Sequence, residues 1–253
     1  MIDLHAHILP GVDDGPATLD EACALARAAV LDGIRVMAAT PHVRSDYPTA
    51  PARMEAGVVE VRAALAAERI PLDVLSGAEI ALDMLPDLTD DDLRRLGLGG
   101  NPRYLLLETP YVGWPPGIAQ IFFQLQVRGF RIVLAHPERN GEVQARPELV
   151  RPLVEAGALM QVTAASLDGR LGTRPQRTAL RLIQMGCAHL LASDAHAPAV
   201  RRVGMTAATD AIHNPALADW LSADVPDAIV TDTSVPERPA PSSRRAWMWR
   251  GRW

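Results

Sequence analysis

Short apolar runs, often β-branched, alternate along the chain with longer alanine- and leucine-rich segments of helical period. This alternation is typical of repeated βα units, in which helices join parallel strands. Helices are expected at residues 19–31, 51–68, 116–127, 147–155 and 175–185, followed by a closing helical segment at 204–219 and a short extra strand or loop at 225–232. Seven runs are predicted strands: residues 2–5, 34–39, 72–76, 104–107, 132–135, 159–162 and 189–192.

Six of the seven predicted strands end in a side chain that can bind a metal ion. Right-handed crossovers bring the carboxyl ends of parallel strands to one face, so side chains distant in sequence converge there. The spacing between successive strand ends fits one βα unit each. The pattern therefore predicts one polar cluster, built from His5, His42, Glu79, Glu108, His136 and Asp194.

The first strand ends in His5-Ala6-His7, and side chains two residues apart on a strand share a face. Alone, this pair fits either a metal chelate or two polar residues on an exposed edge strand. The turn at Pro10-Gly11 allows the loop carrying Asp13 and Asp14 to fold back over the histidines. The further ligand types at later strand ends favour the chelate.

Length and composition indicate one large domain. The chain has 253 residues and 48% hydrophobic content, enough to bury a sizeable core. We expect this domain at residues 1–232. No run of about 18 apolar residues could span a membrane, and the start does not resemble a signal peptide, so a cytoplasmic protein is expected. Cys23 and Cys187 lie in apolar segments and are expected to be buried free thiols.

All 25 basic residues are arginine, and the chain contains no lysine. A Schiff-base lysine and a phosphate-binding loop of the G-x-x-x-x-G-K type are therefore both excluded. A Cys-x5-Arg phosphatase loop is excluded as well, because Ala29 and Ser193 stand six residues after the two cysteines. The net charge of -5 gives no reason to expect nucleic acid as a partner of the main domain.

Residues 233–253 differ from the rest in composition: prolines are followed by arginines interleaved with tryptophans. Five arginines against the single acidic residue Glu237 give this segment a charge of +4 before the terminal carboxylate. One interpretation is a flexible or loosely docked tail. The other is weak contact with a membrane surface, nucleic acid or an acidic partner.

Several short blocks follow one another along the chain. They begin at Asp3 (DLHAHILPGVDDG), Ala39 (ATPH), Gly77 (GAEI), Leu107 (LETP), Ala135 (AHPER), Gln161 (QVTAAS) and Ala192 (ASDAH). Taken together, these blocks resemble the signature of the polymerase and histidinol phosphatase (PHP) superfamily. Within it they are most similar to the bacterial capsule and exopolysaccharide tyrosine-protein phosphatases. The resemblance runs in order from Met1 to about Arg202.

The resemblance implies a distorted seven-stranded (β/α)7 barrel, TIM-like and of PHP type, that holds three divalent ions. Manganese is the usual metal, and iron or zinc would also suit the donors. Arg139 and Arg201 match phosphate-binding positions, with Arg202 as the alternative to Arg201. Asn140 departs from the pattern, because the family commonly has an aromatic residue there, and this concerns substrate contacts at the pocket edge. The implied ligands are His5, His7 and Asp194 for one ion, Glu108 and His136 for the second, Glu79 bridging these two, and Asp14, His42 and His196 for the third.

Charge explains why such a cluster suits phosphate. Four ligand carboxylates carry -4 against +6 on three divalent ions, which leaves about +2 to bind a phosphate dianion. Water on such ions can have its pKa lowered to about 7 and so supply hydroxide as the nucleophile.

We therefore expect a metal-dependent protein-tyrosine phosphatase that acts on a tyrosine kinase of capsule or exopolysaccharide synthesis. A small-molecule phosphatase of the histidinol-phosphate type is the alternative enzyme. A non-catalytic barrel that binds the kinase or a membrane is the alternative of another class.

Overall fold

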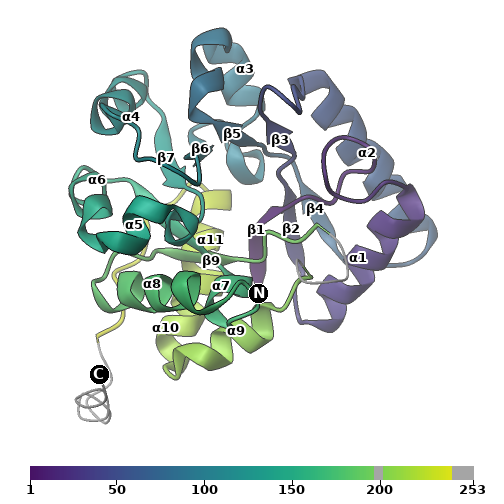
Figure 1. Ribbon diagram of the computed structural model, residues 1–253. Helices are drawn as coiled ribbons and strands as arrows, with labels where there is room; N and C mark the ends of the chain where they lie inside the picture. The colour runs from purple at the N-terminus through teal and green to yellow at the C-terminus, as the bar shows by residue number, and fades with distance from the viewer. Residues whose placement is uncertain (197–201, 241–253) are drawn as a thin grey trace.

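The computed structural model describes residues 1–196 and 202–240, which form a curled parallel β-sheet with helices on its outer side (Figure 1). The strands of this described part are β1 (Ile2–Ala6), β2 (Val36–Ala39), β3 (His42–Val43), β4 (Asp73–Leu75), β5 (Glu79–Ala81), β6 (Tyr104–Glu108), β7 (Arg131–Leu134), β8 (Leu159–Thr163) and β9 (Leu190–Ala192). Its α-helices are α1 (Leu19–Leu31), α2 (Pro51–Ala67), α3 (Asp90–Arg95), α4 (Ile118–Val127), α5 (Gly141–Ala145), α6 (Arg151–Glu155), α7 (Ala164–Leu167), α8 (Thr173–Gln184), α9 (Met205–Ile212), α10 (Pro215–Asp219) and α11 (Val225–Val230). Further helical turns are η1 (Leu82–Asp87), η2 (Leu98–Gly100), η3 (Pro137–Arg139), η4 (Pro147–Val150) and η5 (Trp220–Asp224).

The strands form two hydrogen-bonded sheets, in the orders β1-β2-β4 and β3-β5-β6-β7-β8-β9, and every paired neighbour is parallel. The two sheets meet where the chain passes from β2 to β3 and from β4 to β5. On the other side, a bridge between Ala6 and Ala195 joins β1 to the end of β9. Two backbone hydrogen bonds of 2.8 Å support it, from His7 to Ala195 and from Asp194 to His5. The sheet therefore curls until its first and last strands meet.

Burial explains why these segments form strands and helices. All five residues of β6 are buried, as expected for a parallel strand covered on both faces. Helix α1 begins where the Thr18 side chain accepts a hydrogen bond from the amide of Glu21, which caps the helix. The helix then buries one stripe against the sheet, made by Ala22, Cys23, Leu25, Ala26 and Ala29.

The seven predicted strands are all present, each within two residues of its expected bounds. The described chain has two further strands, β3 and β5, which are too short for the apolar pattern to reveal. The extra strand or loop expected at 225–232 is wrong, because most of this segment is the helix α11. Its β-branched residues suggested a strand. However, Pro226 stands in the first turn and the buried residues Val225, Ala228 and Ile229 follow helical spacing.

Residues 233–240, the start of the expected tail, lie against the domain. The Trp220 indole donates to the Pro236 carbonyl at 3.0 Å. The Arg238 guanidinium donates to the carbonyls of Ala188 and Ile183 and lies over the Trp220 ring. The arginine- and tryptophan-rich residues 241–253 lie outside the described part of the chain. Across the described residues, no helix combines the length and apolarity needed to cross a membrane.

Asp3 connects the first and last strands from inside the fold. Its Oδ1 accepts hydrogen bonds from the backbone amides of His5 and Ser193, and the residue is fully buried. We expect Asp3→Ala to lower the free energy of unfolding by about 1 to 3 kcal/mol, because the Ser193 amide then lacks its buried acceptor. Urea unfolding measures this effect. Asp73→Ala, at an exposed position of β4, is the control, and equal losses for the two variants would contradict the assigned role.

Candidate metal centre

The structure brings all nine predicted ligands together at one end of the curled sheet. The β1 end supplies His5, His7 and the loop residue Asp14; β3 supplies His42 and β5 supplies Glu79. Glu108 ends β6, and His136 follows β7. Asp194 and His196 follow β9. Eight of the nine are buried, and the Asp14 side chain is 39% exposed, so the cluster opens to solvent beside Asp14.

His5, His7 and Asp194 form the first group. The Nε2 atoms of the two histidines lie 3.3 Å apart and 3.5 and 3.4 Å from Asp194 Oδ1. Ligands placed tetrahedrally about 2.1 Å from an ion lie about 3.4 Å from one another. The three atoms therefore have the spacing of ligands around one ion.

Glu79 lies at the centre of the cluster and is fully buried. Its Oε2 is 3.3 Å from His5 Nε2, 3.4 Å from His7 Nε2 and 2.9 Å from His42 Nδ1. Its Oε1 lies 2.7 Å from His136 Nε2. Burial raises the pKa of this carboxyl. The field of His5 and the hydrogen bond with His136 outweigh that effect and hold the Glu79 pKa well below its usual range.

Glu108 and His136 extend the cluster away from β1. Glu108 Oε1 lies 3.8 Å from His136 Nε2, and its Oε2 lies 4.0 Å from His42 Nδ1. Burial and the nearby Glu79 charge raise the pKa of Glu108 to about 7. Burial and the adjacent Arg139 lower the pKa of His136 to about 4, so its imidazole is neutral, as a metal ligand requires.

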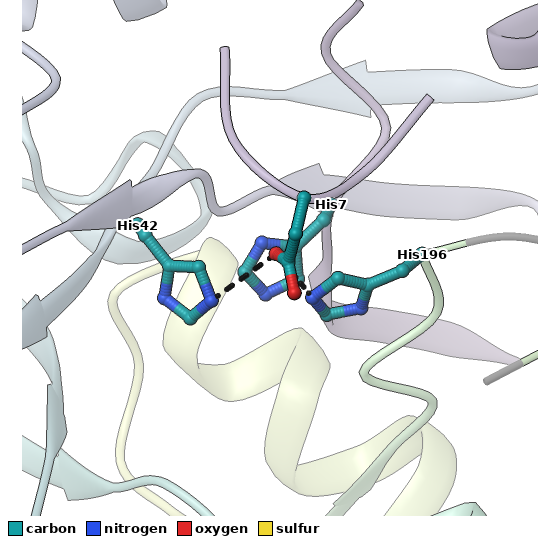
Figure 2. Close-up of side chains that lie close together, drawn as sticks. His7, His42 and His196 are labelled. Carbon is teal, nitrogen blue, oxygen red and sulfur yellow. Dashed lines mark ion pairs between the residues drawn. The ribbon is translucent and has the colours of Figure 1, made fainter. Parts of the chain in front are cut away.

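A third group surrounds the Asp14 carboxylate. Asp14 Oδ1 is 3.0 Å from His196 Nε2 and 3.4 Å from His42 Nε2. Figure 2 shows the imidazoles of His7, His42 and His196 turned toward one another, with ion pairs drawn from the last two. His7 and His196 stack with ring centroids 3.7 Å apart. These four residues place one ligand atom each within 4.8 Å of one another.

Two buried atoms indicate that the donors fit divalent ions. Glu79 Oε2 and His42 Nδ1 are 2.9 Å apart, yet neither has a hydrogen-bond partner of acceptable geometry. Buried polar atoms are nearly always paired, so such orphans call for a partner. Imidazoles and carboxylates without a thiolate form the donor set of a catalytic divalent-metal site. The cluster can therefore hold divalent metal ions.

Two residues outside the predicted ligand set orient the histidines. Asp13 Oδ2 lies 2.7 Å from His7 Nδ1 and accepts from the His42 amide at 3.0 Å. Gln161 Oε1 lies 3.0 Å from His5 Nδ1. Contacts of this kind fix the ring orientation of metal-binding histidines. In the sequence Asp13 is the alternative to Asp14 as a ligand, and Gln161 is only the first residue of a family-like block, so neither contact can be assigned without the fold.

Arg139, predicted to bind phosphate, points into the cluster. Its Nη1 donates to Asp194 Oδ2 at 2.5 Å, and its guanidinium lies over the Tyr111 ring at 4.7 Å. Arg201, the other predicted phosphate-binding residue, lies outside the described residues. Its alternative, Arg202, is exposed, and its carbonyl accepts a hydrogen bond from Arg170.

Asn140 is a structural residue rather than an exposed one. It is buried, and its Oδ1 accepts from the amides of Glu142 and Val143, which caps α5. Its Nδ2 donates to the carbonyls of Pro110 and Gly113 at 2.6 and 2.8 Å. Asn140 therefore fixes the loop that carries Tyr111, whose ring lies against Arg139.

Comparisons with known proteins agree with this site. A family described as capsular polysaccharide synthesis, CpsB/CapC, matches residues 1–223. The tyrosine-protein phosphatase YwqE of Bacillus subtilis is 40% identical over 78% of this chain and 77% of its own length. The putative tyrosine-protein phosphatase CapC of Staphylococcus aureus is 32% identical over the same shares.

A solved structure is similar over nearly the whole chain. It belongs to a study of YwqE from Bacillus subtilis and CpsB from Streptococcus pneumoniae, described as unique metal-dependent tyrosine phosphatases. The TM-score is 0.85 at 33% identity, covering 95% of this chain and 100% of the other. A β-aspartyl dipeptidase from Fervidobacterium islandicum, with TM-score 0.55 and 11% identity over 90% of this chain and 74% of its own, shares the fold alone.

Metal binding should release protons. Burial lowers the pKa of His42, but the adjacent carboxylates of Asp14 and Glu79 outweigh it and raise the pKa to about 9. The metal-free protein therefore carries a proton on His42 at pH 7, and an ion bound there displaces it. We expect Mn²⁺ affinity to rise from pH 6 to 9. Calorimetric titration at pH 7 in two buffers of different ionisation enthalpy measures the proton release, and a buffer-independent heat would contradict it.

Asp13→Ala should weaken Mn²⁺ binding by about 10- to 100-fold, because His7 loses the carboxylate that orients its ring. Metal titration monitored by calorimetry gives the affinity. Asp20→Ala, at an exposed position of α1, removes the same charge at a distance and serves as the control. If both variants bind Mn²⁺ as tightly as the unmodified protein, Asp13 does not position a ligand.

Proposed function

The chain belongs to the CpsB/CapC family of capsular polysaccharide synthesis, and we propose that it is the family's metal-dependent protein-tyrosine phosphatase. The observation that carries this proposal is the convergence of five histidines and four carboxylates at one end of the curled sheet, with Arg139 directed into the same cluster. The proposed substrate is a phosphotyrosine-containing kinase of capsule or exopolysaccharide synthesis. The proposed location is the cytoplasm, consistent with Cys23 and Cys187 as buried free thiols.

We propose three divalent ions, most suitably manganese. The first would be held by His5, His7 and Asp194, which form one of the ligand-spaced groups. Glu108 and His136 would hold the second, and the first two would share Glu79 as a ligand. The third would be held by Asp14, His42 and His196. Bound there, the ions would stabilise the charge of the phosphate and activate the attacking water.

Arg139 is proposed to bind the phosphate of the substrate. A planar guanidinium can donate to two phosphate oxygens at once, and the Tyr111 ring packs against this one. Because Asp194 and Tyr111 already hold Arg139 at the edge of the cluster, its donors are in place before the ester arrives. Arg201 remains the proposed second phosphate-binding arginine.

The strand count of the barrel and the bounds of the domain are also proposals. We propose that β2 with β3, and β4 with β5, are two interrupted strands of the seven-stranded barrel that the resemblance implies. The proposed domain comprises residues 1–232. Residues 233–253 are the proposed tail, although its first eight residues contact η5, α8 and the segment before β9. Contact of the tail with a membrane or an acidic partner is a separate proposal.

The substrate class can be tested directly. With Mn²⁺ present, kcat/KM should be higher for phosphotyrosine peptides than for histidinol phosphate and other small alkyl phosphomonoesters. A preference for the small esters would favour the histidinol-phosphate alternative. Purified protein without transition metal and without aryl-phosphate hydrolysis would favour the non-catalytic barrel.

His136→Ala and Asp194→Ala should each lower kcat for p-nitrophenyl phosphate by at least about 100-fold, because each removes a proposed ligand. The circular dichroism spectrum should show that the fold is retained. His213→Ala, at the C-terminal end of α9, removes a histidine far from the cluster in sequence and serves as the control. Near-normal turnover in either ligand variant would remove that residue from the proposed site.

A further inference from the structure

A groove of about 680 Å³ opens beside the metal centre. It is lined by Glu108, a proposed metal ligand, and by Arg44 and Tyr111. Leu82, which follows β5, and Ile121 on α4 also line it. A volume of several hundred cubic ångströms is typical of ligand sites. It exceeds what the phosphorylated tyrosine side chain alone requires.

Part of the groove wall is apolar. Besides Leu82 and Ile121, it is lined by Ala81, Pro110 and Pro115. Val112, on the same loop as Tyr111, is 88% exposed. Covering apolar surface of this kind with a ligand side chain stabilises the complex.

The charges of the groove do not favour an acidic ligand. Arg44 donates through Nε and Nη2 to Asp46 at 2.9 and 2.7 Å, and its Nη1 lies 3.7 Å from Glu108 Oε2. Its positive charge is therefore balanced within the groove wall. Asp83, which also lines the groove, is exposed and adds a negative charge. An acidic side chain would meet like charge there, whereas an apolar one would not.

We propose that this groove binds an apolar side chain that neighbours the phosphotyrosine in the substrate polypeptide, with Leu82 and Ile121 determining that preference. Glu108 is both a proposed metal ligand and part of the groove wall, so a peptide whose phosphate lies on the metal centre has the groove beside it. Successive residues of an extended peptide rise about 3.3 Å each, and we expect a residue next to the phosphotyrosine to reach the groove. This inference rests on the proposed tyrosine phosphatase function.

Two matched phosphotyrosine peptides test the groove on the unmodified enzyme. One carries leucine on both sides of the phosphotyrosine, and the other carries serine at the same positions. We expect kcat/KM to favour the leucine peptide by about tenfold or more. A third peptide with glutamate at these positions should be the poorest of the three. Equal values for the leucine and serine peptides would overturn the inference.

Variants locate the preference. Ile121→Ala and Leu82→Ala should each reduce the leucine-to-serine ratio to about two or less, since each shortens an apolar wall. Val127→Ala is the matched control, because Val127 lies on the same helix as Ile121, is 71% exposed and lies outside the groove. A ratio that survives in both groove variants would overturn the assignment of Leu82 and Ile121.

The ratio separates failure of this inference from failure of the proposed function. Each ratio compares two peptides on one variant, so partial loss of folded protein cancels. If the enzyme hydrolyses p-nitrophenyl phosphate and both peptides, with equal kcat/KM for the two peptides, only the inference about the groove is overturned. Absence of hydrolysis of every aryl phosphate by the manganese-loaded enzyme would overturn the proposed function, and the groove with it.

Discussion

The buried carboxylate of Glu79 is the interaction on which the rest of the site depends. A carboxylate is costly to bury unless positive charge or hydrogen-bond donors surround it. Four imidazoles meet Glu79 within 3.4 Å, from His5, His7, His42 and His136. They come from the ends of three different strands. Curling of the sheet is what allows these distant segments to meet at one carboxylate, so fold and chemistry share one constraint.

Most of the fold could be predicted from the sequence because parallel strands buried on both faces give continuous apolar runs. The predicted strands match for this reason. Apolar runs do not predict β3 and β5, which have two and three residues and no apolar period of their own. Apolar runs also mispredict α11. There, β-branched residues lie in a helix and face the core, because the surrounding elements bury one helical stripe.

The candidate site, too, could be predicted from the sequence only in part. Residues of ligand type at strand ends could be predicted from their spacing, since crossovers bring strand ends together. Adjacent positions on a loop, by contrast, do not reveal which of Asp13 and Asp14 faces the centre of the cluster. In the fold, Asp14 lies beside His196, and Asp13 lies behind His7. The four hydrogen bonds of Asn140 likewise depend on two loops meeting, which no local pattern reveals.

The central claim is that nine side chains from the strand ends hold three divalent ions. Crystals of the protein grown with Mn²⁺, measured on both sides of the manganese absorption edge, test it most directly. The account predicts three anomalous peaks. One would lie among His5, His7 and Asp194, a second beside Glu108 and His136, and a third among Asp14, His42 and His196. A well-ordered cluster without anomalous density at these positions would contradict it.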